Sequence, residues 1–219
     1  VITKIGDSAI DNQGMVKIGP NLRVRFQYRV QQLAKDGKVP LTVVRAGKPM
    51  QIQLPVNNVR KLLIPNLNGA YPSYFIYGPI VFSRASGEFL SGLNSGGIQA
   101  FSFIGNPLIT RRGDQPDAKH DELVVVSSPF FPHKLVTGYS NRQGSVVESI
   151  NDIPVRSLSH LVEVLRDLKD ELVVIKFAQR AGESIVLPRK AMMEATEGVL
   201  TDNGIRSQGS PELMKVWTR

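Results

Sequence analysis

The 219-residue sequence contains no cysteine and no long apolar run. The absence of cysteine excludes disulfides, thiol catalysis and cysteine-ligated metals, and it is compatible with an exported protein but says little more about the compartment. No stretch approaches the roughly 18 consecutive apolar residues of a membrane span. The first residues read as a strand and no basic segment followed by an apolar run precedes them, so we expect a fragment without a signal peptide.

Histidine is also scarce, and the sequence has only His120, His133 and His160. Their spacing matches no recognisable metal site, and no glycine-rich phosphate-binding loop occurs. We therefore expect no metal and no other cofactor.

Acidic residues are few in the first half of the chain. Residues 1–110 hold 12 Lys/Arg against 4 Asp/Glu, a net charge of +8, whereas residues 111–219 hold 15 of each. This excess predicts either a solvated basic face or a surface for an acidic partner, such as nucleic acid or a neighbouring subunit. Since no basic motif with interleaved aromatic residues occurs, nucleic acid is the weaker interpretation.

Two segments share one plan of strand, turn, amphipathic helix and hairpin, with Arg-Ala-Gly in each hairpin turn. The first is predicted as a strand at 1–5, a turn at 6–7, a helix over 21–34 and a hairpin of 39–45 with 50–56. The second is predicted as a strand at 145–150, a turn at 151–152, a helix over 157–168 capped by Ser157, and a hairpin of 172–178 with 184–188. A duplicated small unit is the economical explanation.

The remaining segments are less regular. The patterns predict a strand over 74–82 broken by Gly78-Pro79, a helical turn at 88–93, a loop over 111–121 and a strand at 123–127. A further helix is expected over 190–203 with Gly204 as its C-cap, followed by a tail that is loose or docks Trp217 onto a partner.

Several of these runs resemble one protein family. GSVVESINDIPVRSLSHLVEVL (144–165) resembles the core of PDZ domains in HtrA-type proteases, and VITKIGDSAI (1–10) with LTVVRAGKPMQIQLPV (41–56) resembles parts of a preceding PDZ domain. YPSYFIYGPIVFS (71–83) and AMMEATEGVLTDNGIRS (191–207) resemble the plant-type branch of Deg proteases, which are DegP-like.

The resemblance implies an α+β fold, dominated by β structure, of PDZ-like small β-barrel or sandwich domains, each with an amphipathic helix. Four regions are expected in chain order: a partial first PDZ domain at 1–60 without its carboxylate-binding start, a linker at 61–73, a second PDZ domain at 74–190 with an inserted loop around 105–121, and a C-terminal helix and tail at 191–219.

The resemblance also implies a peptide-binding groove in the second domain, where an extended peptide adds a strand beside a helix. The expected groove residues are Tyr77, Gly78, Pro79, Ile80, Val81 and Phe82, with Leu158, Leu161, Val162 and Leu165 as the helical wall. Pro79 removes one N–H donor from the carboxylate-binding loop. We therefore predict that this groove binds an internal segment or is occupied by the chain itself, and that it serves assembly.

Residues 93–97, LNSGG, resemble the sequence around the nucleophile of chymotrypsin-like and HtrA proteases. Those proteases need a histidine before that serine in chain order, and all three histidines follow Ser95. We predict a flexible Ser/Gly turn there and no catalytic residue in the chain.

The function implied is that of a peptide- and protein-interaction and oligomer-assembly region in an HtrA/Deg-like serine endopeptidase, regulating substrate access. Its partners would be protein segments and neighbouring protease subunits, in a homo-oligomer. Two alternatives stay open: a stand-alone PDZ scaffold without a protease domain, and a basic adaptor that binds nucleic acid through residues 23–61.

Overall fold

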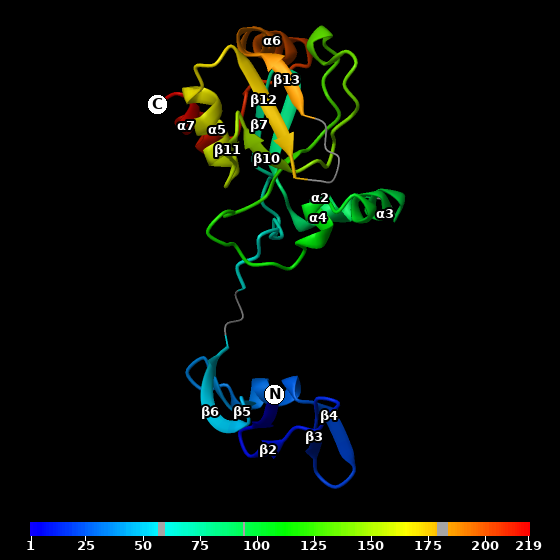
Figure 1. The fold of residues 1–219 in the computed structure, drawn as a ribbon, viewed down its shortest axis with the longest axis vertical. Coiled ribbons are helices and arrows are strands. Elements are labelled where there is room, and N and C mark those ends of the chain that lie inside the picture. Colours follow the sequence, from blue (N-terminus) through cyan, green and yellow to red (C-terminus); the bar gives the residue numbers. More distant parts are fainter. Residues whose placement is uncertain (57–59, 94, 179–183) are drawn as a thin grey trace. The chain divides into compact units, whose positions relative to one another are not determined.

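The computed structural model describes residues 1–56, 60–93, 95–178 and 184–219. The chain divides into two compact units, Val1–Arg60 and Lys61–Arg219, which are described separately (Figure 1). Each combines short antiparallel sheets with helices, which confirms the α+β class. Within the described ranges, no helix has both the length and the apolar character needed to cross a membrane.

The first unit is built on a four-stranded antiparallel sheet in the order β2-β1-β5-β6. Its strands are β1 (Ile2–Ile5), β2 (Ser8–Ala9), β5 (Lys38–Arg45) and β6 (Lys48–Pro55). Ala46 and Gly47 both have positive φ in the two-residue turn between β5 and β6, as this kind of hairpin requires. A second hairpin, β3 (Met15–Ile18) with β4 (Leu22–Arg25), leads into the short helix α1 (Gln27–Leu33).

The helix predicted over 21–34 is wrong in its first half, because residues 22–25 form β4. Leu22 and Val24 alternate with two arginines, and this period of two suits a strand. Gly19, with a φ of +64°, lies in the turn that returns the chain from β3. Only the second half of the predicted stripe is helical, with Val30 and Leu33 packed against the buried cluster of this unit.

The second unit contains two sheets. One has the order β11-β10-β12-β13 and the other the order β7-β8-β9. The strands are β7 (Tyr74–Tyr77), β8 (Ile80–Arg84), β9 (Val124–Val126), β10 (Val147–Ile150), β11 (Ile153–Pro154), β12 (Leu172–Phe177) and β13 (Ile185–Pro188). The helix α5 (Leu158–Asp167) is capped by the Ser157 hydroxyl, which accepts a hydrogen bond from the His160 N–H, as the sequence predicted.

The two units repeat one pairing pattern. Ile5 of β1 lies opposite Leu41 of β5, and Ile150 of β10 lies opposite Ile175 of β12. Both strand pairs then have a register shift at the matching place. It lies between Ile2 and Lys4 in the first unit and between Val147 and Ser149 in the second. The same irregularity at the same place supports a duplicated unit. The second Arg-Ala-Gly turn, at 180–182, lies outside the described residues.

Between β8 and β9 the chain forms three helices: α2 (Gly87–Ser91), α3 (Ser95–Phe103) and α4 (Pro107–Thr110). The helical turn predicted at 88–93 is confirmed by α2, whereas the flexible turn predicted around Ser95 is wrong because α3 begins there. The segment 61–73, predicted as a linker, contributes Leu63 and Ile64 to a buried cluster with Leu90 and Leu108. The predicted inserted loop around 105–121 contains α4, and the rest of it is irregular.

Two helices follow β13. The first, α6 (Arg189–Asp202), matches the predicted helix, and Gly204 just beyond it has a φ of +63°. The second, α7 (Pro211–Trp217), replaces the tail that was predicted to be loose or to dock onto a partner. Leu213 of α7 is part of the main buried cluster of the second unit, so this helix packs against its own domain.

Candidate functional site

The predicted groove residues 77–82 form the turn and second strand of the β7–β8 hairpin. Gly78 and Pro79 make a two-residue turn, and Gly78 takes the positive φ, +55°, that its first position requires. Phe75 of β7 lies opposite Phe82 of β8, and Phe82 also lies opposite Val126 of β9. Since β8 has a neighbour on both sides, it offers no free edge to an added peptide strand.

The predicted helical wall lies on α5, which contacts both β7 and β8 (Figure 1). All four of its predicted residues are at most 2% exposed and belong to the main buried cluster: Leu158, Leu161, Val162 and Leu165. Phe75 and Tyr77 of β7 and Ile80 and Phe82 of β8 belong to the same cluster. The structure therefore brings seven of the ten predicted groove residues into one cluster, and β7 occupies one edge of β8.

The loop predicted to bind a carboxylate is held by two neighbouring segments. The Gly78 N–H donates to the Thr196 hydroxyl of α6 at 2.8 Å. Pro79 has no N–H, and its carbonyl accepts a hydrogen bond from the Phe131 N–H at 2.9 Å. A Cβ on Gly78 would lie 2.6 Å from the Met192 sulfur, so α6 directly covers the turn.

The outer edge of β7 is also covered, by residues 207–210. The Ile76 N–H donates to the Gln208 carbonyl at 2.8 Å, and the Ser210 N–H donates to the Tyr74 carbonyl at 2.9 Å. The Gln208 side-chain amide returns a bond to the Ile76 carbonyl at 2.9 Å. This segment therefore forms an isolated antiparallel β-bridge with β7, between Gly209 and Phe75, and its backbone bonds are of the kind that a bound peptide makes.

The helix α7 closes this arrangement by packing on α5. The Trp217 ring lies 5.2 Å from the Phe75 ring and 6.0 Å from the Tyr77 ring, between centroids. The Tyr77 hydroxyl is buried and has no hydrogen-bond partner in the described part of the chain. Burial raises the pKa of Tyr77 to about 12, and the nearby Arg189 charge opposes this shift.

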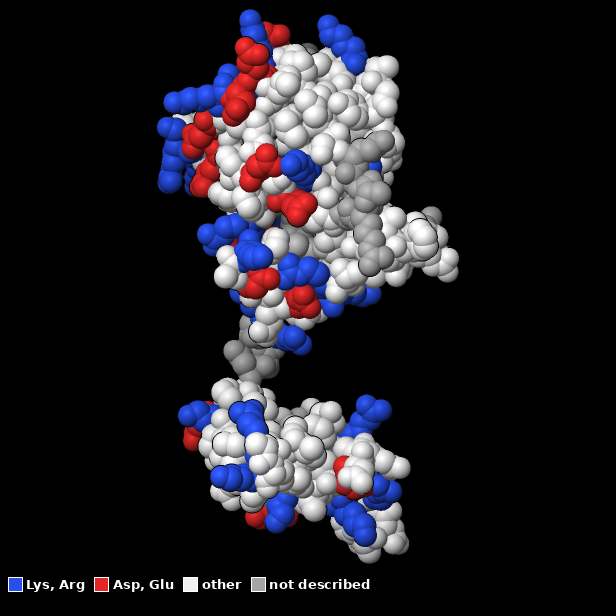
Figure 2. Space-filling view, viewed as in Figure 1, with Lys and Arg blue, Asp and Glu red and all other residues white. Residues whose placement is uncertain are grey.

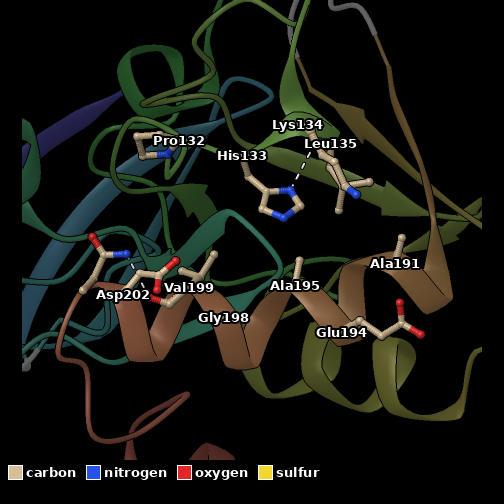
Figure 3. Close-up of a pocket in the computed structure, with 11 residues that line it drawn as sticks. Pro132, His133, Lys134, Leu135, Ala191, Glu194, Ala195, Gly198, Val199 and Asp202 are labelled. Atoms are coloured by element: carbon tan, nitrogen blue, oxygen red, sulfur yellow. Dashed lines mark hydrogen bonds between the residues drawn. The ribbon is translucent and has the colours of Figure 1, made fainter.

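A hollow of about 530 Å³ lies beside the covered turn, between α6 and residues 132–135 (Figure 3). On the α6 side it is lined by the small residues Ala191, Ala195 and Gly198, with Glu194, Val199 and Asp202 beside them. His133 Nδ1 accepts a hydrogen bond from the Leu135 N–H at 3.2 Å, so the other ring nitrogen, Nε2, faces the hollow. One wall is α6, which also holds Gly78 through Thr196. The other is the segment that directly follows Phe131, which holds Pro79.

Sequence reasoning found the interrupted strand over 74–82 and the helix of this site, but it missed the pairing of β7 with β8 and the segments that cover them. Thr196, Met192, Gln208 and Trp217 were not predicted as site residues. The one available signal was Trp217, a large aromatic residue near the end of α7 that was expected to dock on another surface. It docks on the aromatic side chains of β7.

Comparison with known proteins agrees with this architecture. A family model described as "PDZ domain" matches residues 65–212. The chain is 26% identical to "Protease Do-like 2, chloroplastic" of Arabidopsis thaliana over 216 residues, 98% of the chain and 34% of that protein. It is 28% identical to "Serine protease DegP homolog" of Plasmodium falciparum over 172 residues, 77% of the chain and 18% of that protein.

A third relative, "Putative protease Do-like 11, mitochondrial" of Arabidopsis thaliana, is 22% identical over 213 residues, which are 97% of the chain and 33% of that protein. The chain thus spans about a third or less of the length of these relatives. Since the family model covers about two thirds of its residues, the chain belongs to the PDZ-domain family.

Proposed function

We propose that this chain is the assembly and regulatory region of an HtrA/Deg-like serine endopeptidase, and that its second PDZ domain controls substrate access without capturing free C-termini. The observation that carries this proposal is β7, which pairs along β8 beside α5, where a peptide ligand of a PDZ domain would add its strand. The relatives named as proteases supply the expected context.

The surroundings of β7 support a filled groove. A carboxylate ligand needs unpaired backbone N–H groups in the loop, but the Gly78 N–H is already bonded to Thr196 and Pro79 has none. A second strand cannot reach the outer edge of β7 either, because residues 207–210 are paired there. The edge of β8 is thus covered by β7, and the outer edge of β7 by residues 207–210. A domain covered in this way is suited to keep a fixed shape between subunits.

Peptide titration of the 219-residue chain tests this proposal. Short peptides with apolar C-terminal residues and a free carboxylate are compared with the same peptides carrying a C-terminal amide. We expect no saturable binding of either set up to millimolar concentration, as followed by amide shifts of Ile80, Val81 and Phe82. Micromolar binding of the free acids with shifts at these three residues would contradict the proposal.

The assembly role requires the longer polypeptide that contains a protease domain. Sedimentation analysis is made of that polypeptide and of a version that ends at Arg60. We expect the shortened version to form a smaller oligomer and to cleave an unfolded substrate at an altered rate. An unchanged oligomer together with an unchanged rate would overturn the assembly and regulatory roles.

A further inference from the structure

The first unit carries a segment with no acidic residue. Between Asp11 and Asp36 the chain has five basic residues and no Asp or Glu. This segment forms the β3–β4 hairpin and α1. Residues 1–60 as a whole hold ten Lys/Arg against three Asp/Glu, a net charge of +7, so the hairpin stands out in a unit that is itself strongly basic.

The register of the hairpin places its charges on one face. Lys17 lies directly opposite Arg23, and Arg25 lies opposite Met15 on the same face. Like charges directly opposite each other destabilise an isolated strand pair. Figure 2 shows Lys and Arg side chains gathered over this hairpin, with one acidic patch among them. An anion beside this face would reduce the repulsion between these charges.

The neighbouring acid neutralises only part of this charge. Asp11 forms an ion pair with Arg23, and its carboxylate also accepts hydrogen bonds from the Gln13 N–H at 2.9 Å and the Met15 N–H at 3.0 Å. The bonds from the backbone, above all from Met15, together with Arg23 lower the pKa of Asp11. Lys17 and Arg25 form no ion pair within the described ranges, so two positive charges stay available to a partner.

The opposite face of the hairpin is apolar and changes from buried to exposed along its length. Val16, near the base, is 1% exposed and lies in the core of the unit. Leu22, at the tip, is 55% exposed although it lies on the same face. The tip therefore combines an exposed leucine with basic side chains on the reverse face.

We propose that the β3–β4 hairpin docks this unit onto an anionic lipid bilayer. Leu22 enters the interfacial region of the bilayer, while Lys17, Arg23 and Arg25 lie at the level of the headgroups. A short apolar insertion and a basic cluster are each weak alone and bind stably together. Each basic side chain near an anionic surface contributes about 1 kcal/mol, and salt screens this attraction.

The hairpin fits a lipid surface better than it fits nucleic acid. Phosphate contacts alone need no exposed leucine at the tip, and single-stranded nucleic acid is bound by stacking on aromatic side chains. The strands β3 and β4 contain no aromatic residue. Leu22 is therefore the residue that separates the two partners experimentally.

Co-sedimentation of the whole 219-residue chain with vesicles tests the proposal. The vesicles contain phosphatidylcholine alone or a mixture of phosphatidylcholine and phosphatidylglycerol. We expect binding only to the mixture, with weaker binding at high salt. The double variant Lys17→Gln/Arg25→Gln should bind about 30-fold more weakly, since it lacks two of the basic side chains. Leu22→Ser should bind roughly five-fold more weakly, because it loses the apolar insertion.

The control variant Lys38→Gln/Lys48→Gln removes the same charge from the β5–β6 hairpin of the same unit. It should retain nearly all of the binding, and thermal unfolding should show that every variant is folded. An equal loss in the control would overturn the proposal, because bulk charge would then explain the binding. Tighter binding of the chain to duplex DNA, unaffected by Leu22→Ser, would overturn it in favour of nucleic acid.

Discussion

The Gly78 N–H donates to the Thr196 hydroxyl over 2.8 Å, and this bond joins residues 118 positions apart in the sequence. It occupies the backbone donor that a carboxylate-binding loop would offer to a ligand. The Thr196 hydroxyl in turn donates to the Met192 carbonyl at 2.9 Å, so its position on α6 is fixed. The covering helix and the turn beneath it therefore form one hydrogen-bonded unit.

Replacing Thr196 should show how much this bond contributes. The change Thr196→Val keeps the shape of the side chain but leaves the buried Gly78 N–H without its acceptor, so we expect a loss of about 1–3 kcal/mol in unfolding free energy. Thr196→Ser keeps the hydroxyl and should lose clearly less. Chemical denaturation of both variants measures the difference, and equal stabilities would contradict a structural role for the bond.

Any side chain at Gly78 should destabilise the second unit. Its φ is +55°, and an added Cβ would lie 2.6 Å from the Met192 sulfur and 2.9 Å from its methyl carbon. We expect Gly78→Ala to destabilise the second unit by roughly 2–4 kcal/mol, from backbone strain and overpacking together.

Gly198 lies on α6, the helix that carries Met192, and provides the matched control. A Cβ there meets nothing within 4 Å, and the residue lies inside α6. Gly198→Ala should therefore stabilise the protein by up to about 1 kcal/mol. If both alanine variants shifted the denaturation midpoint in the same direction, the close approach of Met192 to Gly78 would not be the cause.

The single tryptophan of the chain reports on the docking of α7. Leu213 is 3% exposed in the main cluster, so Leu213→Ala should destabilise the packing of α7 by about 2–4 kcal/mol. As Trp217 leaves the rings of Phe75 and Tyr77, its emission should shift to longer wavelength at lower denaturant concentration than the loss of β structure. Lys215→Ala changes an exposed residue on the same helix and should leave both transitions unchanged.

Local patterns predicted the repeated strand–helix–hairpin plan because its signals lie within short windows. Ser157 is a good N-cap followed by an apolar stripe, so α5 could be found, and Gly78-Pro79 marked the break in the strand predicted over 74–82 without showing that its two halves pair. The helix predicted over 21–34 failed because Leu22 and Phe26 fit a helical stripe as well as Leu22 and Val24 fit a strand. Only pairing with β3 decides between these two patterns.

The covering of the groove depends on long-range contacts that no window contains. Gln208 pairs with Ile76, and Thr196 with Gly78, across more than a hundred residues. The sequence did indicate that the loop was unusual, since Pro79 removes a donor. It could not indicate that β7 itself lies beside β8, because strand pairing is a property of the folded chain.

Tyr77 should make the stability of the second unit depend on alkaline pH. Burial raises its pKa in the folded state to about 12, whereas an unfolded tyrosine ionises near a pKa of about 10. Below pH 10 both states are protonated and the contribution of Tyr77 to stability is complete. Above it, the unfolded state loses its proton first, so the free energy of unfolding should fall as the pH rises from 10 to 12.

The change Tyr77→Phe should remove this part of the pH dependence. It also removes a buried hydroxyl that lacks a hydrogen-bond partner within the described residues, so we expect neutral to slightly increased stability at pH 7. Tyr71→Phe is the control, because the Tyr71 side chain is 96% exposed. This change should not alter the slope of unfolding free energy against pH. Denaturant unfolding at a series of pH values gives both slopes. Identical slopes for the two variants would show that Tyr77 titrates like an exposed tyrosine. That result would contradict the shielding of Tyr77 from water by α7, which the packing of Trp217 indicates.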